Sequence, residues 1–160
     1  MDTAAADRPQ RAYQKAHDSL VGGWNCCQSV LLAMAETLDL SSPDVLKAAT
    51  GFGGGVGNMG SLCGALAAGV LTLGLLNGRR ELAEEQEKER TYLLCAEWHR
   101  RFAQAMGGSD CRVILGVDLK DPATRKQYWA APGNRERCAS RTVGTAARLL
   151  AELVEESQRT

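Results

Sequence analysis

The sequence predicts an all-α protein, a compact helical bundle around one central, buried helix rich in Gly, Ala and Leu. An uncharged run, GFGGGVGNMGSLCGALAAGVLTLGLLNG, occupies residues 51–78. Its first part is a glycine-dense loop, and residues 61–76 are apolar or small, as in a helix buried on most sides. The other segments show helical spacing of apolar residues, and no segment shows the sustained alternation of a strand. These observations together favour a bundle of helices.

The segments before this run are expected to be helical. Residues 1–8 are expected to be disordered, and residues 9–157 to form a single domain, because 160 residues suit one core. Pro9 can open a first helix, which Gly22-Gly23 interrupts. Asn25 can cap a second helix, whose apolar stripe is formed by Cys27, Val30, Leu31, Met34 and Leu38. Ser41-Ser42-Pro43-Asp44 is a start signal for a short helix over residues 45–50.

The segments after the run continue the pattern. A long helix is expected over residues 80–106, charged in its first half and ended by Gly107-Gly108. Ser109 and Asp110 can open a short helix that carries Cys111. Residues 116–133 form the least regular stretch, with Tyr128-Trp129 expected to be exposed. Asn134 can cap the last helix.

Composition limits the possible partners. Lys plus Arg equals Asp plus Glu, 19 each, so charge favours neither nucleic acid nor an anionic membrane. Residues 61–76 are shorter than the roughly 20 residues of a membrane span. The N-terminus lacks the apolar region of a secretory signal, which predicts a cytoplasmic protein with reduced thiols.

Four of the six cysteines fall in or near the first turn of a predicted helix: Cys26, Cys63, Cys111 and Cys138. Ser61 is the expected N-cap of the central helix, which would put Cys63 in its first turn. Helix N-termini stabilise thiolates, and four converging thiolates would form a cage for a cationic or iron–sulfur centre. Cys27 lies on the core stripe of its helix, and this makes it the more structural thiol of the adjacent pair.

Other chemistries lack their usual motifs. There is no C-x-x-C, as zinc ribbons and thioredoxins require, and no C-x-x-C-H for covalent haem, so no haem is expected. The glycine loop resembles phosphate-binding loops in composition, but it follows a helix and no P-loop lysine follows it. His17 and His99 lie beside charged residues and are expected on the surface.

Several spaced motifs together resemble one family. They are Asn25-Cys26-Cys27-Gln28-Ser29, Gly51-Phe52-Gly53-Gly54-Gly55, Cys63-Gly64-Ala65 with Gly69 and Gly74, Asp110-Cys111-Arg112, and Cys138. The chain is similar over about residues 10–155 to the C_GCAxxG_C_C family, to which a redox role is assigned. The resemblance implies a small helical domain with Cys26, Cys63, Cys111 and Cys138 as its functional set. Related split-Soret cytochromes use a similar domain to hold a [2Fe-2S] cluster beside haems. This chain departs from the family pattern at Cys27, where alanine is common, and at Cys95, which has no counterpart.

Three functional hypotheses remain open from the sequence. The first is an electron carrier or redox sensor whose four cysteines ligate a [2Fe-2S] cluster, with Gly53, Gly54, Gly55 and Gly64 packing close or donating N–H groups to it. The second is metal-free thiol–disulfide chemistry, with Cys63 as a low-pKa nucleophile and Cys26 or Cys111 as its resolving partner. The third is a structural zinc site or a helical interaction module. An unidentified redox partner protein is expected in the first two cases.

A smooth strip formed by Gly60, Gly64 and Gly69 invites close approach by another helix. The second helix belongs either to the same chain or to a second subunit, and the expectation is a homodimer.

Overall fold

The computed structural model describes residues 7–159, so residues 1–6 of the segment 1–8 that was expected to be disordered lie outside the described part, and the first helix already begins at Arg8. The all-α prediction is confirmed: the described residues form helices and one isolated β-bridge, and no strand. In chain order the elements are α2 (Arg8–Val21), α3 (Cys26–Leu38), α4 (Pro43–Ala48), the 3₁₀ turn η1 (Ala49–Phe52), α5 (Gly64–Asn77), α6 (Glu85–Met106), α7 (Cys111–Leu115), α8 (Pro122–Ala130), α9 (Asn134–Arg137), the π-helical segment η2 (Cys138–Gly144) and α10 (Thr145–Arg159).

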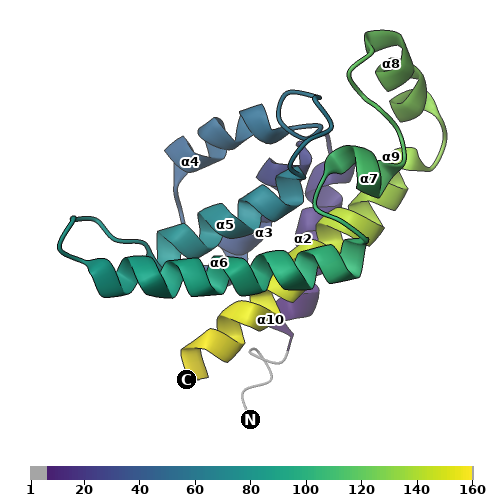
Figure 1. The fold of residues 1–160 in the computed structure, drawn as a ribbon. Helices are drawn as coiled ribbons and strands as arrows, with labels where there is room; N and C mark the ends of the chain where they lie inside the picture. Colours follow the sequence, from purple (N-terminus) through teal and green to yellow (C-terminus); the bar gives the residue numbers. More distant parts are fainter. Residues whose placement is uncertain (1–6, 160) are drawn as a thin grey trace.

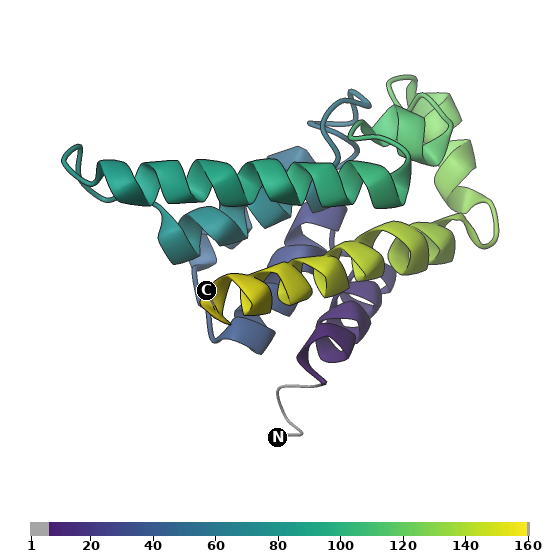
Figure 2. The same ribbon diagram turned by 60° about the horizontal axis from the view of Figure 1, so that its bottom comes forward.

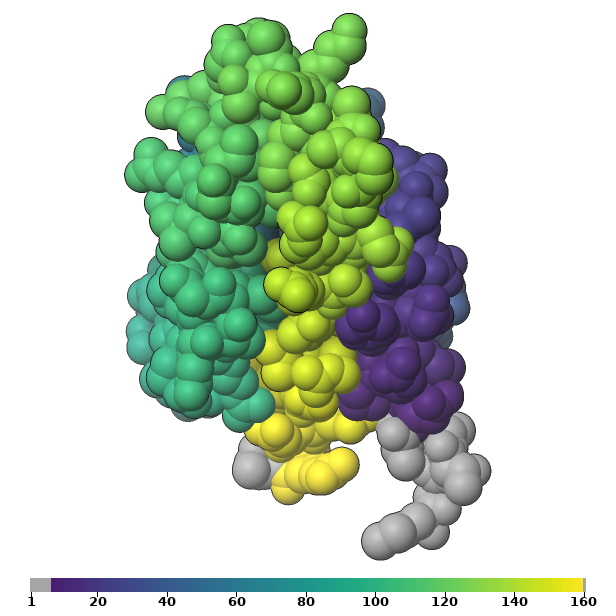
Figure 3. Space-filling view, turned by 90° about the vertical axis from the view of Figure 1, so that its right-hand side faces the viewer, coloured from purple at the N-terminus to yellow at the C-terminus, as the bar shows by residue number. Residues whose placement is uncertain are grey.

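The helix α5 is the centre of the bundle, as predicted. It packs against α3, α6 and α10, while α2 covers α3 and α10 on the other side. Figure 1 shows α6 lying along α5, and the space-filling view shows α10 running between α6 and α2 (Figure 3). Residues of α5 from Gly64 to Gly69 are buried, whereas Val70 and Leu75 are exposed, so the helix is covered more fully at its N-terminal end.

Side chains of the same chain pack directly against two glycines of α5, Gly64 and Gly69. A Cβ on Gly69 would lie 2.1 Å from Nε1 of Trp98, which donates to the carbonyl of Leu66 at 2.9 Å. Trp98 is fully buried and stacks obliquely on Phe102 of α6. Helix α6, rather than a second subunit, therefore makes the close approach at Gly69 that the small residue permits.

Several predicted boundaries are wrong. Helix α6 begins at Glu85 and not near residue 80, because the Glu84 carboxylate accepts from the backbone N–H groups of Arg80 and Glu81 and holds a turn there. Residues 122–130 are helical and not irregular: Asp121 caps α8 by accepting from Thr124 N at 2.7 Å, and Pro122 occupies its first turn. The residue that caps α9 is Gly133, in the left-handed region, and not Asn134.

Candidate functional site

One end of the bundle contains a cavity of about 290 Å³. It lies where α3, α5, α7 and η2 begin, beneath the loop of residues 53–63 that appears beside α7 in Figures 1 and 2. Four thiols line this cavity, and they are those of Cys26, Cys63, Cys111 and Cys138. The cavity is called the cysteine pocket below.

The start of α3 places Cys26. Asn25 caps the helix, and its side chain accepts from Gln28 N at 2.9 Å and donates to the carbonyl of Thr50 at 3.0 Å. The Gln28 amide donates in turn to Thr50 Oγ1 at 3.0 Å. Because both polar side chains hold the chain just ahead of the glycine loop, the first turn of α3 and that loop are fixed relative to each other. This confirms Asn25 as the predicted cap.

The glycine loop wraps around Cys26 in a left-handed backbone. Gly54, Gly55 and Gly57 have positive φ, and so do Val56 at 61° and Asn58 at 67°. A β-branched residue in this region is strained, and such strain persists only where the surroundings impose it. Here backbone hydrogen bonds impose it, since the N–H groups of residues 57, 58, 60 and 61 each donate to a carbonyl five or six residues back.

The sulfur of Cys26 lies in a nest of backbone groups. The N–H groups of Gly54, Cys27 and Gly64 point toward it, and a Cβ on Gly64 would lie only 2.3 Å from the sulfur. Burial nevertheless raises the pKa of the Cys26 thiol, and these N–H groups act in the opposite direction. Gly54 and Gly64 therefore have defined places beside this thiol, while Gly53 packs on the Asn25 side chain. Gly55 lies against Ser61 and the Cβ of Cys111.

A short pairing of two loops brings Cys63 and Cys111 together. Leu62 and Asp110 form an antiparallel bridge, in which Cys63 N donates to Ser109 O at 2.9 Å and Cys111 N donates to Ser61 O at 2.7 Å. This pairing corrects one expectation: Ser61 lies in extended chain, and Cys63 itself is the N-cap of α5. Because Leu62 and Asp110 lie far apart in the sequence, no local sequence pattern predicts this pairing.

The fourth thiol lies on a π-helical segment. Cys138 follows the single turn of α9 and begins η2, so it lies five residues after the cap Gly133, one residue further into the helix than expected. Such segments occur often at functional sites, where they redirect side chains. At the end of η2, a Cβ on Gly144 would meet the Tyr13 ring at 2.8 Å, which shows how closely α2 packs there.

His17 of α2 contacts Glu136, two residues before Cys138. Its Nε2 lies 2.6 Å from Glu136 Oε1, and its Nδ1 lies 2.9 Å from Asp18 Oδ1. These carboxylates, Glu136 foremost, raise the pKa of His17. The histidine is therefore a link between α2 and α9, while His99 is exposed as expected.

Burial makes the four thiols poor acids. It raises the pKa of Cys111 and of Cys138 to about 12, and that of Cys63 well above its ordinary value. Proximity to Cys26 raises all three further. The expectation of a low-pKa Cys63 is thus wrong, because desolvation outweighs the nearby N–H groups of Ala65 and Leu66.

Arg135 is the charged side chain of the cysteine pocket, since the other described lining residues are neutral side chains and thiols. Its guanidinium lies 5.6 Å from the ring centre of Trp129, and its Nη1 donates to the Leu20 carbonyl at 3.3 Å. It also opposes the rise in the Cys138 pKa. The sequence reasoning missed Arg135 and placed Trp129 on the surface, whereas Tyr128 and Trp129 are half-buried. The cap signal Asp121-Pro122 could have revealed the helix that carries Trp129.

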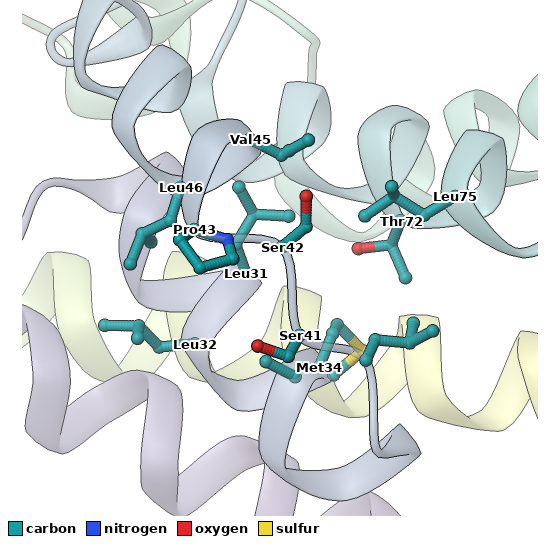
Figure 4. A pocket seen from close by; sticks show the side chains of 12 residues that line it. Leu31, Leu32, Met34, Ser41, Ser42, Pro43, Val45, Leu46, Thr72 and Leu75 are labelled. Atoms are coloured by element: carbon teal, nitrogen blue, oxygen red, sulfur yellow. The ribbon is translucent and has the colours of Figure 1, made fainter.

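Two cysteines lie outside the pocket. Cys27 is fully buried in the core, as its helical position predicts, and Cys95 is half-buried on α6. Within residues 7–159, no three or more His, Cys, Asp or Glu side chains converge as a site for one metal ion. A second cavity of about 180 Å³ lies between α3, α4 and α5, and the side chains labelled in Figure 4 show its largely apolar lining.

Comparison with known proteins identifies the class. The chain matches the family described as "Putative redox-active protein (C_GCAxxG_C_C)" over residues 24–153, and it belongs to this family. An uncharacterized protein of Archaeoglobus fulgidus is 30% identical over 112 residues, which cover 66% of this chain and 74% of the relative. No solved structure matches. Among the described residues, no helix is both long enough and apolar enough to cross a bilayer.

Proposed function

We propose that the protein is an electron carrier or redox sensor that holds a [2Fe-2S] cluster in the cysteine pocket. The observation that carries the proposal is the common cavity lined by Cys26, Cys63, Cys111 and Cys138. These thiols come from four separate segments and surround a void, and the donors of a binuclear cluster are four cysteine thiolates. Among the described residues no three such side chains converge on one metal ion, whereas a binuclear cluster divides its four thiolates between two irons.

Each part of the pocket would have a role toward this group. The four cysteines would be its ligands, and the N–H groups of Gly54 and Gly64, which already point toward the Cys26 sulfur, would stabilise ligand charge. Arg135 would offset the negative charge of four thiolates, held in place by Trp129. When bound, the cluster would supply reversible one-electron transfer.

The first test is the visible spectrum, with iron and sulfide assays, of protein purified without oxygen. Charge-transfer absorption with two irons and two sulfides per chain is the expected result. Cys26→Ser and Cys63→Ser should lose the absorption. Cys27→Ala and Cys95→Ala should retain it, because those side chains lie outside the pocket. Equal colour in all four variants would refute the ligand assignment.

Metal-free thiol–disulfide chemistry is the second candidate, favoured by the position of the Cys26 sulfur beside Gly64, the residue next to Cys63. Oxidation of two such thiols to a disulfide would release two electrons and two protons. It ranks second because the thiolate is the nucleophile, and burial keeps these thiols protonated. Non-reducing mass mapping of colourless protein should find one bridge among the four pocket cysteines, and four free thiols after mild oxidation would exclude this chemistry.

A further inference from the structure

The segments that build the cysteine pocket also expose large apolar side chains. Trp24, Val56, Met59 and Val113 are between 44% and 57% exposed, and we call this set the mouth patch. Trp24 itself lines the pocket. The other three each adjoin a lining residue, namely Gly57, Asn58 and Ile114. Exposed apolar surface at the opening of a site marks an interaction surface more often than isolated apolar residues do.

The mouth patch is held by a rigid framework. Arg112 N donates to Gly60 O at 3.1 Å, and a Cβ on Gly60 would lie 3.1 Å from the Cβ of Arg112. The glycine loop and α7 are therefore joined side by side, as both ribbon views show (Figures 1 and 2). The backbone of Val56 is held by hydrogen bonds on both sides: its N–H donates to Phe52 O, and its carbonyl accepts from Met59 N. The Val56 side chain therefore stays exposed.

The segments that carry the mouth patch have a small excess of positive charge. Residues 48–63 carry no charged side chain, whereas residues 107–144 carry seven Lys or Arg and four Asp or Glu. Arg112 is more than half exposed, and its partner Asp110 is 3.6 Å away, a loose surface pair. Arg135 adds a second positive charge within the pocket. The whole chain is neutral, so the excess of positive charge belongs to this end of the sequence.

We propose that the mouth patch is the docking surface for an acidic electron-carrier protein. The apolar side chains would exclude water at the pocket opening, and Arg112 would pair with carboxylates at the edge of the partner. Charge at such an edge sets the association rate and the partner choice more than the affinity. The inference rests on the proposed redox function, but it concerns binding and can be tested without electron transfer.

The test is an NMR titration of the ¹⁵N-labelled protein with oxidised flavodoxin, a small acidic carrier, at low ionic strength. The indole N–H signal of Trp24 should shift, whereas that of Trp98, buried in the core, should not. Basic cytochrome c at the same concentration should leave Trp24 unshifted. Raising the salt to about 0.5 M should weaken flavodoxin binding at least about ten-fold, because exposed charges are screened at that concentration.

Matched variants locate the surface. Met59→Glu and Arg112→Glu should each weaken flavodoxin binding about ten-fold or more. Leu93→Glu is the control, because Leu93 is a 73% exposed apolar residue on α6, away from the pocket lining. Absence of a Trp24 shift, an equal shift with cytochrome c, or equal weakening by Leu93→Glu would overturn the proposal.

Sedimentation of the protein alone tests whether a second copy of this chain covers the mouth patch. A dimer that Met59→Glu dissociates would show that the mouth patch joins two copies of this chain, which also overturns the proposal. If the purified protein contains no cluster but still binds flavodoxin, only the proposed cluster function is refuted. The failure of the docking proposal and the failure of the proposed function can therefore be told apart.

Discussion

Replacing Gly64 by alanine adds one methyl group at the tightest point of the cysteine pocket. The new Cβ would lie 2.3 Å from the Cys26 sulfur, 3.0 Å from Phe52 O and 3.1 Å from Cys27 N. Carbon and its neighbours normally rest about 3.5–4.0 Å apart, so either α5 or the start of α3 must move by about 1 Å. Overpacking of this kind costs about 1–3 kcal/mol, and the gain in helix propensity returns about 1 kcal/mol. A net loss of up to about 2 kcal/mol would lower the melting temperature by up to roughly 8 °C.

Calorimetry measures the change in melting temperature, and the visible spectrum measures the cluster content. Gly64→Ala should lower the melting temperature and reduce the cluster content, since the displaced Cys26 loses its N–H neighbours. Gly74→Ala is the matched control on the same helix, because an added Cβ there has no neighbour within 4 Å. It should be neutral or stabilising by up to about 1 kcal/mol. If the two variants behave alike, the close packing at Gly64 has no influence on the pocket, and the reasoning fails.

Two further predictions concern charge. Arg135→Gln should lower the midpoint potential of the pocket's redox centre by tens of millivolts, since one unit charge at an effective dielectric near 20 contributes on the order of 1 kcal/mol, or about 40 mV for one electron. Arg137→Gln, two residues further along, should shift it much less, because the Arg137 guanidinium donates to Asn134 Oδ1 and does not line the pocket; equal shifts in redox titration would rule out a local effect. His17→Gln should remove a pH-dependent part of the stability. The pKa of His17 is raised in the folded protein, so its contribution is complete below about pH 6.5 and is lost as the pH rises through the folded value. Urea unfolding at pH 5.5 and 8.5 should show a larger difference between wild type and variant at the lower pH, and an equal difference at both would contradict this.

Local signals were sufficient for most of the helices. Asn25 and Asp110 precede the helices α3 and α7 as predicted, and Gly107 ends α6 in the left-handed region. The start of α6 and the helix α8 were missed although local side-chain caps at Glu84 and Asp121 define them, whereas the start of α5 depends on a contact between distant segments. Pairing of Leu62 with Asp110 displaces the start of α5 from Ser61 to Cys63, and no property of the Ser61 neighbourhood reveals that pairing.

Some features of the candidate site could also be predicted from the sequence, and others could not. Helix periodicity separated Cys27, which lies in the core, from Cys26, which lines the pocket. The acidity of Cys63 was mispredicted, because a helix N-terminus can be read from sequence but the depth of its burial cannot. Arg135 was overlooked for a related reason: its importance comes from Trp129 and Leu20, which reach it only in the folded chain.

The wide separation of the pocket cysteines along the chain has a consequence for synthesis. Cys138 follows Cys26 by 112 residues, so a growing chain carries three of the thiols before the fourth has left the ribosome. Helix α10, which packs on α2, must also be complete before the π-helical segment can be held in place. The pocket therefore cannot form until η2 has been made and has folded onto α2, and loading of a cofactor would report that this step is complete.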